Sequence, residues 1–182
     1  MVKMRKAFFL DRDGVINKSK VVAGKPFAPT QICDIKILPG VCDALDLLRE
    51  AGFLNIIVTN QPDISTGRQS LNSLAEIHTY LQQKLPIDDV FICPHIEEHY
   101  CQCRKPKPGL LIQAASRWGI DLTGSYMIGD RWRDIEAGQS AGCKTSFFID
   151  YKFAEPRPKG SYIEVSSLLS AANKVLSSNH LL

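Results

Sequence analysis

The sequence predicts an α/β fold of three layers, in which helices cover both faces of a central, mostly parallel sheet. Two observations support this prediction. Short apolar runs typical of buried strands alternate with longer segments whose apolar residues recur at helical spacing, and such alternation implies right-handed crossovers between parallel strands. In addition, chemically reactive residues follow several predicted strands, where an open α/β sheet binds its ligand.

The size and composition of the chain fit one globular domain. Its 182 residues are enough for one domain with a core and too few for two ordinary ones. Hydrophobic residues make up 45% and charged residues 23%, as in soluble proteins. The inserts between motifs are too short for a large cap domain. We therefore expect a single domain over residues 1–182, and a monomer.

Charge and hydropathy exclude several partners. The net charge of +3 does not by itself indicate nucleic acid. No apolar run approaches the roughly 20 residues of a membrane helix. The basic N-terminus is followed by only a short apolar run, 7–10, which is no signal-peptide core. These features predict a cytoplasmic protein that does not contact a membrane.

The elements are delimited by glycine and proline. We expect strands at 7–10, 53–58, 90–92, 125–128 and 145–149. We expect helices at 41–51, 71–85, 110–118, 133–141 and 166–176. The segment 14–39 has little periodicity and is predicted as a long loop with one short strand at 35–37. Such a loop inside a compact domain is usually functional, and here it would lie over the end of the first strand.

The first predicted strand leads directly into Asp11-Arg12-Asp13-Gly14. Because strand side chains alternate between faces, Asp11 and Asp13 can point the same way, and Gly14 lets the chain turn. Two carboxylates at the end of a buried strand are unfavourable unless a cation lies between them. An isolated Asp-x-Asp-Gly is more often a solvated turn, so its meaning depends on the other strand ends.

Other strand ends carry matching chemistry. Thr59 and Asn60 follow the second strand, and Asp130 follows the fourth. The ends of parallel strands share one edge of a sheet, so we expect these residues to meet the aspartate pair. Carboxylates select a hard cation such as Mg²⁺, which also binds substrate phosphate. Arg104 and Lys105 add positive charge, and together these are the parts that phosphoryl transfer needs.

Four motifs occur in the order and spacing of the haloacid dehalogenase (HAD) superfamily. They are Asp11-x-Asp13-Gly14, Thr59 after an apolar strand, Lys105-Pro106, and Gly129-Asp130-x-x-x-Asp134. The strings Asp-Arg-Asp-Gly-Val-Ile-Asn, Thr-Asn-Gln and Cys-Arg-Lys-Pro-Lys-Pro-Gly more specifically resemble histidinol-phosphate phosphatases and D-glycero-D-manno-heptose-1,7-bisphosphate 7-phosphatases. The resemblance covers about residues 5–150 and implies a Rossmann-like, HAD-like fold.

The resemblance implies Mg²⁺-dependent hydrolysis of a phosphate monoester through an aspartyl-phosphate on Asp11. Asp13 would protonate the leaving alkoxide and then activate water. Asp11, the backbone carbonyl of Asp13 and Asp130 would bind Mg²⁺. Thr59 and Lys105 would stabilise the phosphoryl group. This division is physically reasonable, because a carboxylate beside Mg²⁺ and a lysine stays ionised while one away from the metal can carry a proton.

Further roles follow from the same resemblance. Asp134 would orient Lys105, and Arg104 and Arg131 would recognise the substrate. Additional candidate substrate contacts are Asn60, Gln61, Ser19 and Lys20. Lys107 is an alternative to Lys105 for the phosphate, but the family form Lys-Pro-x-Pro favours Lys105.

A cluster of cysteines predicts a second metal. Cys93-x-His95-x5-Cys101-x-Cys103 offers three thiolates and an imidazole, which suits a structural tetrahedral zinc. In a reducing compartment, clustered cysteines indicate metal rather than disulfides. His99 is an alternative to His95, although Cys-Pro-His matches the subgroup. A zinc-binding loop at 93–103 would hold the two basic residues that follow it.

The expected substrate is a small phosphorylated metabolite. By the resemblance, D-glycero-D-manno-heptose 1,7-bisphosphate would lose its 7-phosphate. Histidinol phosphate or another small phosphoester is an alternative. A 3′-phosphorylated nucleic acid is less favoured, since the chain has no basic groove interleaved with aromatics. A non-catalytic zinc-bound binding module is a further alternative, against which the intact motifs argue. The loop 62–68 departs from the family pattern, which weakens the assignment of the family's exact substrate to this chain.

Overall fold

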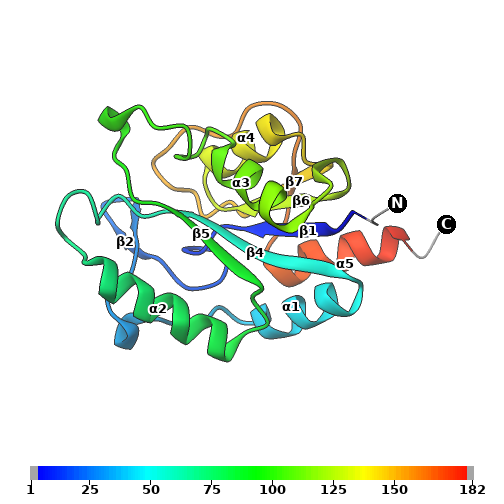
Figure 1. Cartoon of the computed structure of the whole chain (residues 1–182), viewed down its shortest axis with the longest axis horizontal. Coiled ribbons are helices and arrows are strands. Elements are labelled where there is room, and N and C mark those ends of the chain that lie inside the picture. The colour runs from blue at the N-terminus through cyan, green and yellow to red at the C-terminus, as the bar shows by residue number, and fades with distance from the viewer. Residues whose placement is uncertain (1–3, 180–182) are drawn as a thin grey trace.

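The computed structural model describes residues 4–179. The ends of the predicted domain, residues 1–3 and 180–182, lie outside the described part. The central sheet comprises β1 (Lys6–Leu10), β4 (Phe53–Asn60), β5 (Asp89–Cys93), β6 (Tyr126–Gly129), β7 (Thr145–Phe148) and β8 (Ile163–Glu164). The order across the sheet is β5-β4-β1-β6-β7-β8, and every neighbouring pair is parallel (Figure 1).

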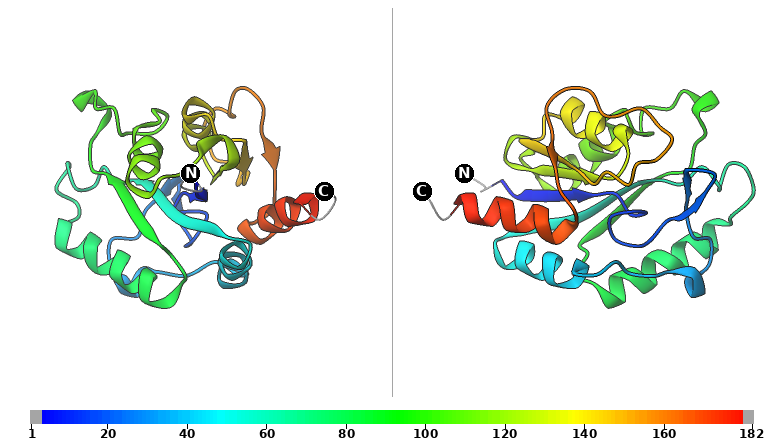
Figure 2. Two further views of the ribbon diagram at one scale, coloured as in Figure 1. Left: turned by 45° about the vertical axis from the view of Figure 1, so that its right-hand side comes forward. Right: turned by 180° about the vertical axis from the view of Figure 1, so that it is seen from behind.

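Helices cover both faces of this sheet (Figures 1 and 2). Within residues 4–179 the α-helices are α1 (Val41–Glu50), α2 (Leu71–Lys84), α3 (Gly109–Trp118), α4 (Trp132–Ala141) and α5 (Leu168–Asn179). Residues of α1, α2 and α5 pack in one core with Phe8 and Leu10. Residues of α3 and α4 pack in a second core with Ala7 and Phe9. The alternation of β1 side chains therefore serves two cores, and the predicted three-layer α/β fold is confirmed.

The local sequence explains where the helices begin and end. The hydroxyl of Ser70 accepts a hydrogen bond from the backbone N–H of Ser73 and so caps α2. Pro86 follows the end of the same helix, where it cannot continue the hydrogen-bond pattern. Gly119 ends α3 in the left-handed conformation, with φ of 62°.

The segment 14–39 is more ordered than predicted. β2 (Lys20–Val22) and β3 (Lys25–Phe27) pair as an antiparallel hairpin, and a 3₁₀ turn, Ile32–Asp34, follows. The predicted strand at 35–37 is wrong, since this stretch holds only an isolated bridge from Ile37 to Asn17. Both hairpin strands are largely exposed, so neither has the buried face that would produce an apolar alternation.

No large cap domain interrupts the strands and helices of the described chain. The hairpin is the main insert between β1 and α1, and it lies beside the carboxyl ends of the strands (Figure 2). Among the helices of residues 4–179, none combines the length and the hydropathy that a membrane span requires.

Candidate active site

The site lies where three adjacent strands end. β1 is flanked by β4 and β6, with Leu10 level with Ile57 and Ile128. The residues that follow these positions are therefore brought together, as the strand pattern predicted. A cavity of about 180 Å³ opens at this edge, and the hairpin closes one side of it through Pro26 and Phe27 of β3.

Lys105 is held by three acceptors at the floor of the cavity. Its buried Nζ lies 2.6 Å from Oδ1 of Asp11, 2.6 Å from Oδ1 of Asp134 and 2.7 Å from the carbonyl oxygen of Val58. Burial alone would lower the pKa of Lys105, but the two carboxylates outweigh it and raise the pKa to about 12. Lys107 instead donates to two backbone carbonyls of the cysteine-rich loop. Lys105 is thus the lysine that lines the cavity.

Three carboxylates form what we call the carboxylate cluster: Asp11, Asp130 and Asp134, with oxygens within 4.8 Å of one another. Burial raises the pKa of Asp11 to about 7, although Lys105 opposes the shift. Burial, followed by the charge of Asp11, raises the pKa of Asp130 well above its usual value. Both side-chain oxygens of Asp130 are buried without a hydrogen-bond partner. The cluster is therefore short of positive charge and offers the hard oxygen donors that Mg²⁺ prefers.

Gly14 allows the residues that follow β1 and β6 to share this cluster. Its φ of 95° is one that residues with a side chain rarely adopt. A Cβ atom at this position would lie 1.9 Å from Oδ2 of Asp130. The predicted turn after the aspartate pair is therefore also the place where the Asp130 carboxylate fits.

Asp13 accepts four hydrogen bonds from its surroundings. Arg12 donates through Nε at 3.1 Å and Nη2 at 2.9 Å, and Asn17 donates at 2.8 Å. The side-chain amide of Gln61 donates to Asp13 at 2.9 Å and also lies 2.9 Å from the hydroxyl of Thr59. Gln61, predicted as a substrate contact, thus connects the Asp13 carboxylate to the Thr59 hydroxyl.

Asn60 holds the backbone of Lys105 through two hydrogen bonds. Its side-chain nitrogen donates to the carbonyl oxygen of Lys105, and its side-chain oxygen accepts from the Lys105 N–H, both at 3.1 Å. Asn60 also lines the cavity. Asn60, which was predicted as a substrate contact, therefore positions Lys105, the residue that pairs with Asp11.

The other predicted substrate contacts separate into two groups. Ser19 and Arg131 line the cavity, and Arg131 is paired there with the carboxylate of Glu155. Arg104 does not line the cavity, because its guanidinium donates to the carbonyl oxygen of His95 at 3.0 Å. Lys20 lies on β2 and lines a neighbouring hollow instead.

Three charged residues of the cavity were missed by the sequence reasoning. Arg133, in the first turn of α4, lines the cavity, as do Asp63 and Arg68, which form an ion pair at 3.1 Å. Asp63 and Arg133 follow the ends of β4 and β6 by three and four positions, whereas Arg68 lies eight positions after the end of β4. A search for any charged residue just after each strand end could have found the first two, while Arg68 gives no such signal.

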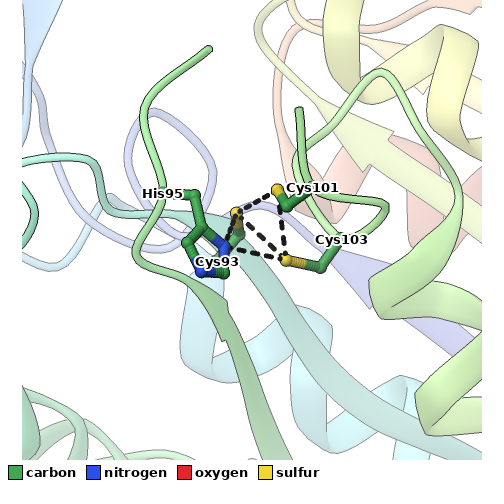
Figure 3. Close-up of side chains that lie close together, drawn as sticks. All are labelled: Cys93, His95, Cys101 and Cys103. Carbon is green, nitrogen blue, oxygen red and sulfur yellow. Dashed lines mark hydrogen bonds between the residues drawn. The ribbon is translucent and has the colours of Figure 1, made fainter. Parts of the chain in front are cut away.

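The predicted zinc ligands come together at the end of β5 (Figure 3). We call Cys93, His95, Cys101 and Cys103 the cysteine–histidine cluster. Their donor atoms lie 3.3 to 3.7 Å apart for the closest pairs, with Nδ1 as the donor of His95. A tetrahedral zinc with Zn–S bonds of about 2.3 Å requires sulfur atoms about 3.8 Å apart. His99 is not part of this group.

The chain is similar to known proteins in sequence and in fold. The family model described as HAD-hydrolase-like matches residues 102–148. A D-glycero-beta-D-manno-heptose-1,7-bisphosphate 7-phosphatase of Helicobacter pylori strain J99 is 34% identical over 155 residues, covering 82% of this chain and 86% of the relative. The enzyme of the same name from Escherichia coli K12 is 32% identical over 161 residues, covering 82% and 81%.

A solved structure shows the same fold. The D,D-heptose 1,7-bisphosphate phosphatase of B. bronchiseptica, complexed with magnesium and phosphate, superposes with a TM-score of 0.84 at 28% identity. The match covers 95% of this chain and 99% of that chain.

The fold and the acidic strand ends, taken with these matches, define a HAD-like phosphatase, a phosphoric monoester hydrolase. The identity extends over about four fifths of the chain and of its relatives. This chain belongs to the D-glycero-beta-D-manno-heptose-1,7-bisphosphate 7-phosphatase family. The predicted superfamily and subgroup are confirmed.

Proposed function

We propose that this protein removes the 7-phosphate of D-glycero-D-manno-heptose 1,7-bisphosphate, as a monomeric, single-domain enzyme of the cytoplasm. The names of its relatives indicate the substrate. The observation that supports the chemistry is the contact of 2.6 Å between Lys105 and Asp11 at the floor of the cavity. The contact supports Asp11 as the nucleophile, because phosphoryl transfer requires a fixed positive charge beside the attacking carboxylate.

The residues present fit a magnesium ion. Asp130 has two buried carboxylate oxygens without partners, and Asp11 lies within reach of the same position. Asp11, Asp130 and the backbone carbonyl of Asp13 would hold the ion. When bound, Mg²⁺ would neutralise charge on the substrate phosphate and on these carboxylates.

In the first step a carboxylate oxygen of Asp11 attacks phosphorus. The bond from phosphorus to the sugar oxygen breaks, and Asp13 gives a proton to that leaving oxygen. The product is a phosphorylated Asp11 and the free sugar hydroxyl. Lys105 and Thr59 stabilise the negative charge of the phosphoryl oxygens.

In the second step a water molecule attacks the phosphorus of the aspartyl-phosphate. Asp13, now a carboxylate, accepts a proton from this water. The bond from phosphorus to the Asp11 oxygen breaks, which releases inorganic phosphate and restores both aspartates. The contacts of Asp134 and Asn60 keep Lys105 in place through both steps.

We also infer a structural zinc in the cysteine–histidine cluster. Four protein donors complete a tetrahedral set and leave no position for a reacting water. Arg104 and Lys105 follow the last ligand directly, and Arg104 donates back to the carbonyl of His95. The ion would therefore hold the loop from which Lys105 enters the cavity.

A phosphate-release assay tests the function. Heptose 1,7-bisphosphate, histidinol phosphate and a 3′-phosphorylated oligonucleotide are compared with and without Mg²⁺. We expect the highest kcat/KM for the heptose bisphosphate, loss of release with EDTA and recovery with added Mg²⁺. Preference for either of the other substrates, or release that EDTA leaves unchanged, would contradict the proposal.

A further inference from the structure

Arg12 lies between the two aspartates of the first motif, and its side chain is fully buried. A buried guanidinium destabilises the fold unless acceptors surround it. Two of its nitrogens, Nε and Nη2, donate to the two oxygens of Asp13 at 3.1 and 2.9 Å. The remaining terminal nitrogen, Nη1, lies 3.1 Å from Nε2 of His78.

His78 comes from a different part of the fold, the sheet-facing side of α2. Arginine has donors only, so Nε2 of His78 must be the acceptor, and the ring is the neutral tautomer with its proton on Nδ1. Burial, together with the charge of Arg12, lowers the pKa of His78 to about 4 and keeps the ring neutral near pH 7. The sequence indicates only a histidine on an apolar helix face, and the structure gives that histidine a specific partner.

We propose that Arg12 and His78 are a positioning pair that fixes the carboxylate of Asp13 for its proton transfers. This inference rests on the proposed function. A two-pronged contact from a planar guanidinium sets the plane of a carboxylate as well as its distance. The contact of Nη1 with His78 holds the third corner of the guanidinium, so that the plane cannot rotate away from Asp13.

The arrangement has a consequence for the chemistry. Asn17 and Gln61 also hold Asp13, one on each oxygen, but each through a single amide nitrogen. Arg12 is the partner that contacts both oxygens. Loss of the His78 acceptor would leave one buried Arg12 nitrogen unpaired and free the guanidinium to turn. The proton of Asp13 would then be misplaced relative to the leaving oxygen, and small misplacements of this kind slow a reaction strongly.

The test uses two substrates that differ in their need for a proton. A sugar phosphate has a poor leaving group and requires the proton from Asp13, whereas p-nitrophenyl phosphate has a good leaving group and requires it much less. The ratio of kcat/KM values reports the step in which the leaving group departs. A residue that only stabilises the fold would change both values together.

His78→Leu removes the acceptor, and His78→Gln offers a carbonyl oxygen in its place. For His78→Leu we expect kcat/KM on the heptose bisphosphate to fall at least roughly tenfold more than on p-nitrophenyl phosphate. For His78→Gln we expect the ratio to recover to within about threefold of the wild-type value. If His78→Leu is insoluble, His78→Met makes the same comparison.

Leu81→Ala is the matched control, because Leu81 is buried on the same helix and has no polar side-chain atom that could hydrogen-bond Arg12. It should lower Tm without changing the substrate ratio. An unchanged ratio in His78→Leu, or equal ratio changes in the Leu and Gln variants, would overturn the positioning role. Failure of the wild-type protein to hydrolyse the sugar phosphate would instead overturn the proposed function itself.

Discussion

The cysteine–histidine cluster and the carboxylate cluster are both suited to metals, but they are assembled differently. The first uses residues within one stretch, 93–103, while the second joins Asp11 to Asp130 across the sheet. The first has soft donors already at tetrahedral spacing, and the second has hard donors, of which Asp11 and Asp134 line a cavity. In the function proposed above, the first would hold a loop and the second a reacting phosphate.

The two clusters meet at adjacent residues. Arg104 donates to the backbone carbonyl of His95 in the cysteine–histidine cluster, and Lys105 contacts the Asp11 carboxylate. From this difference we expect that changes at the cysteine–histidine cluster reduce catalysis by degrees, whereas changes at the carboxylate cluster abolish it. Four measurements would break or sharpen this distinction.

The largest effect is expected from Asp11→Asn. The amide is not a nucleophile, so we expect phosphate release to fall at least about a thousandfold. Tm should change little, since the substitution is isosteric and removes a buried charge. Asp46→Asn, on the exposed side of α1, is the control and should leave release unchanged. Full turnover in Asp11→Asn would remove the nucleophile assignment.

Removal of a zinc ligand should act mainly on stability. We expect Cys103→Ser to lower the free energy of unfolding by about 3 kcal/mol, which lowers Tm by about 10 °C in a chain of this size. Elemental analysis should find one zinc per chain in the wild type. Cys33→Ser, at an exposed cysteine outside the cluster, should keep both zinc and Tm. A wild-type protein without zinc would refute the metal site.

Magnesium should stabilise the folded chain through the carboxylate cluster. At one hundred times its Kd, an ion that binds only the folded state contributes about 2.7 kcal/mol, which we expect as an upward shift of Tm. Asp130→Asn should abolish the shift, because it removes a ligand without partners elsewhere in the protein. Cys103→Ser should still show it. A shift that survives in Asp130→Asn would place the ion elsewhere.

The smallest effect concerns His78, which contacts Arg12, the arginine that pairs with Asp13. Its pKa is about 4 in the folded protein and 6.5 when unfolded. The unfolded state therefore binds the proton first, and stability is lost as pH falls from 6.5 toward 4. Between pH 7 and 5 we expect a loss of about 2 kcal/mol in the free energy of unfolding. His78→Gln, measured by urea unfolding at both pH values, should lack this component.

The sequence predicts most of the sheet and its strand-end chemistry. The strand 7–10 and the helix 110–118 differ from β1 and α3 by one residue. These elements have buried faces, so their apolar periodicity is strong. The β2–β3 hairpin and the two-residue strand β8 have exposed positions and no such pattern, which explains why they were missed.

Residue contacts were less predictable than residue types. The motifs place Asp11 and Asp130 at strand ends. They do not show that Asn60 hydrogen-bonds the Lys105 backbone. Nor do they show that Arg104 donates to the carbonyl oxygen of His95. These contacts depend on loop paths that no local spacing encodes. The pairing of Arg12 with His78 joins residues 66 positions apart, and it depends on how α2 packs on the sheet.

The tight fit of Gly14 against Asp130 has a consequence for engineering. Any side chain at position 14 would push against the acidic group that this structure seats there. A mutagenesis library intended to change the accepted ester should therefore leave position 14 as glycine and diversify the exposed hairpin residues at 20–22, 25 and 27. Variation would then reach the entrance of the cavity while its floor kept the same shape.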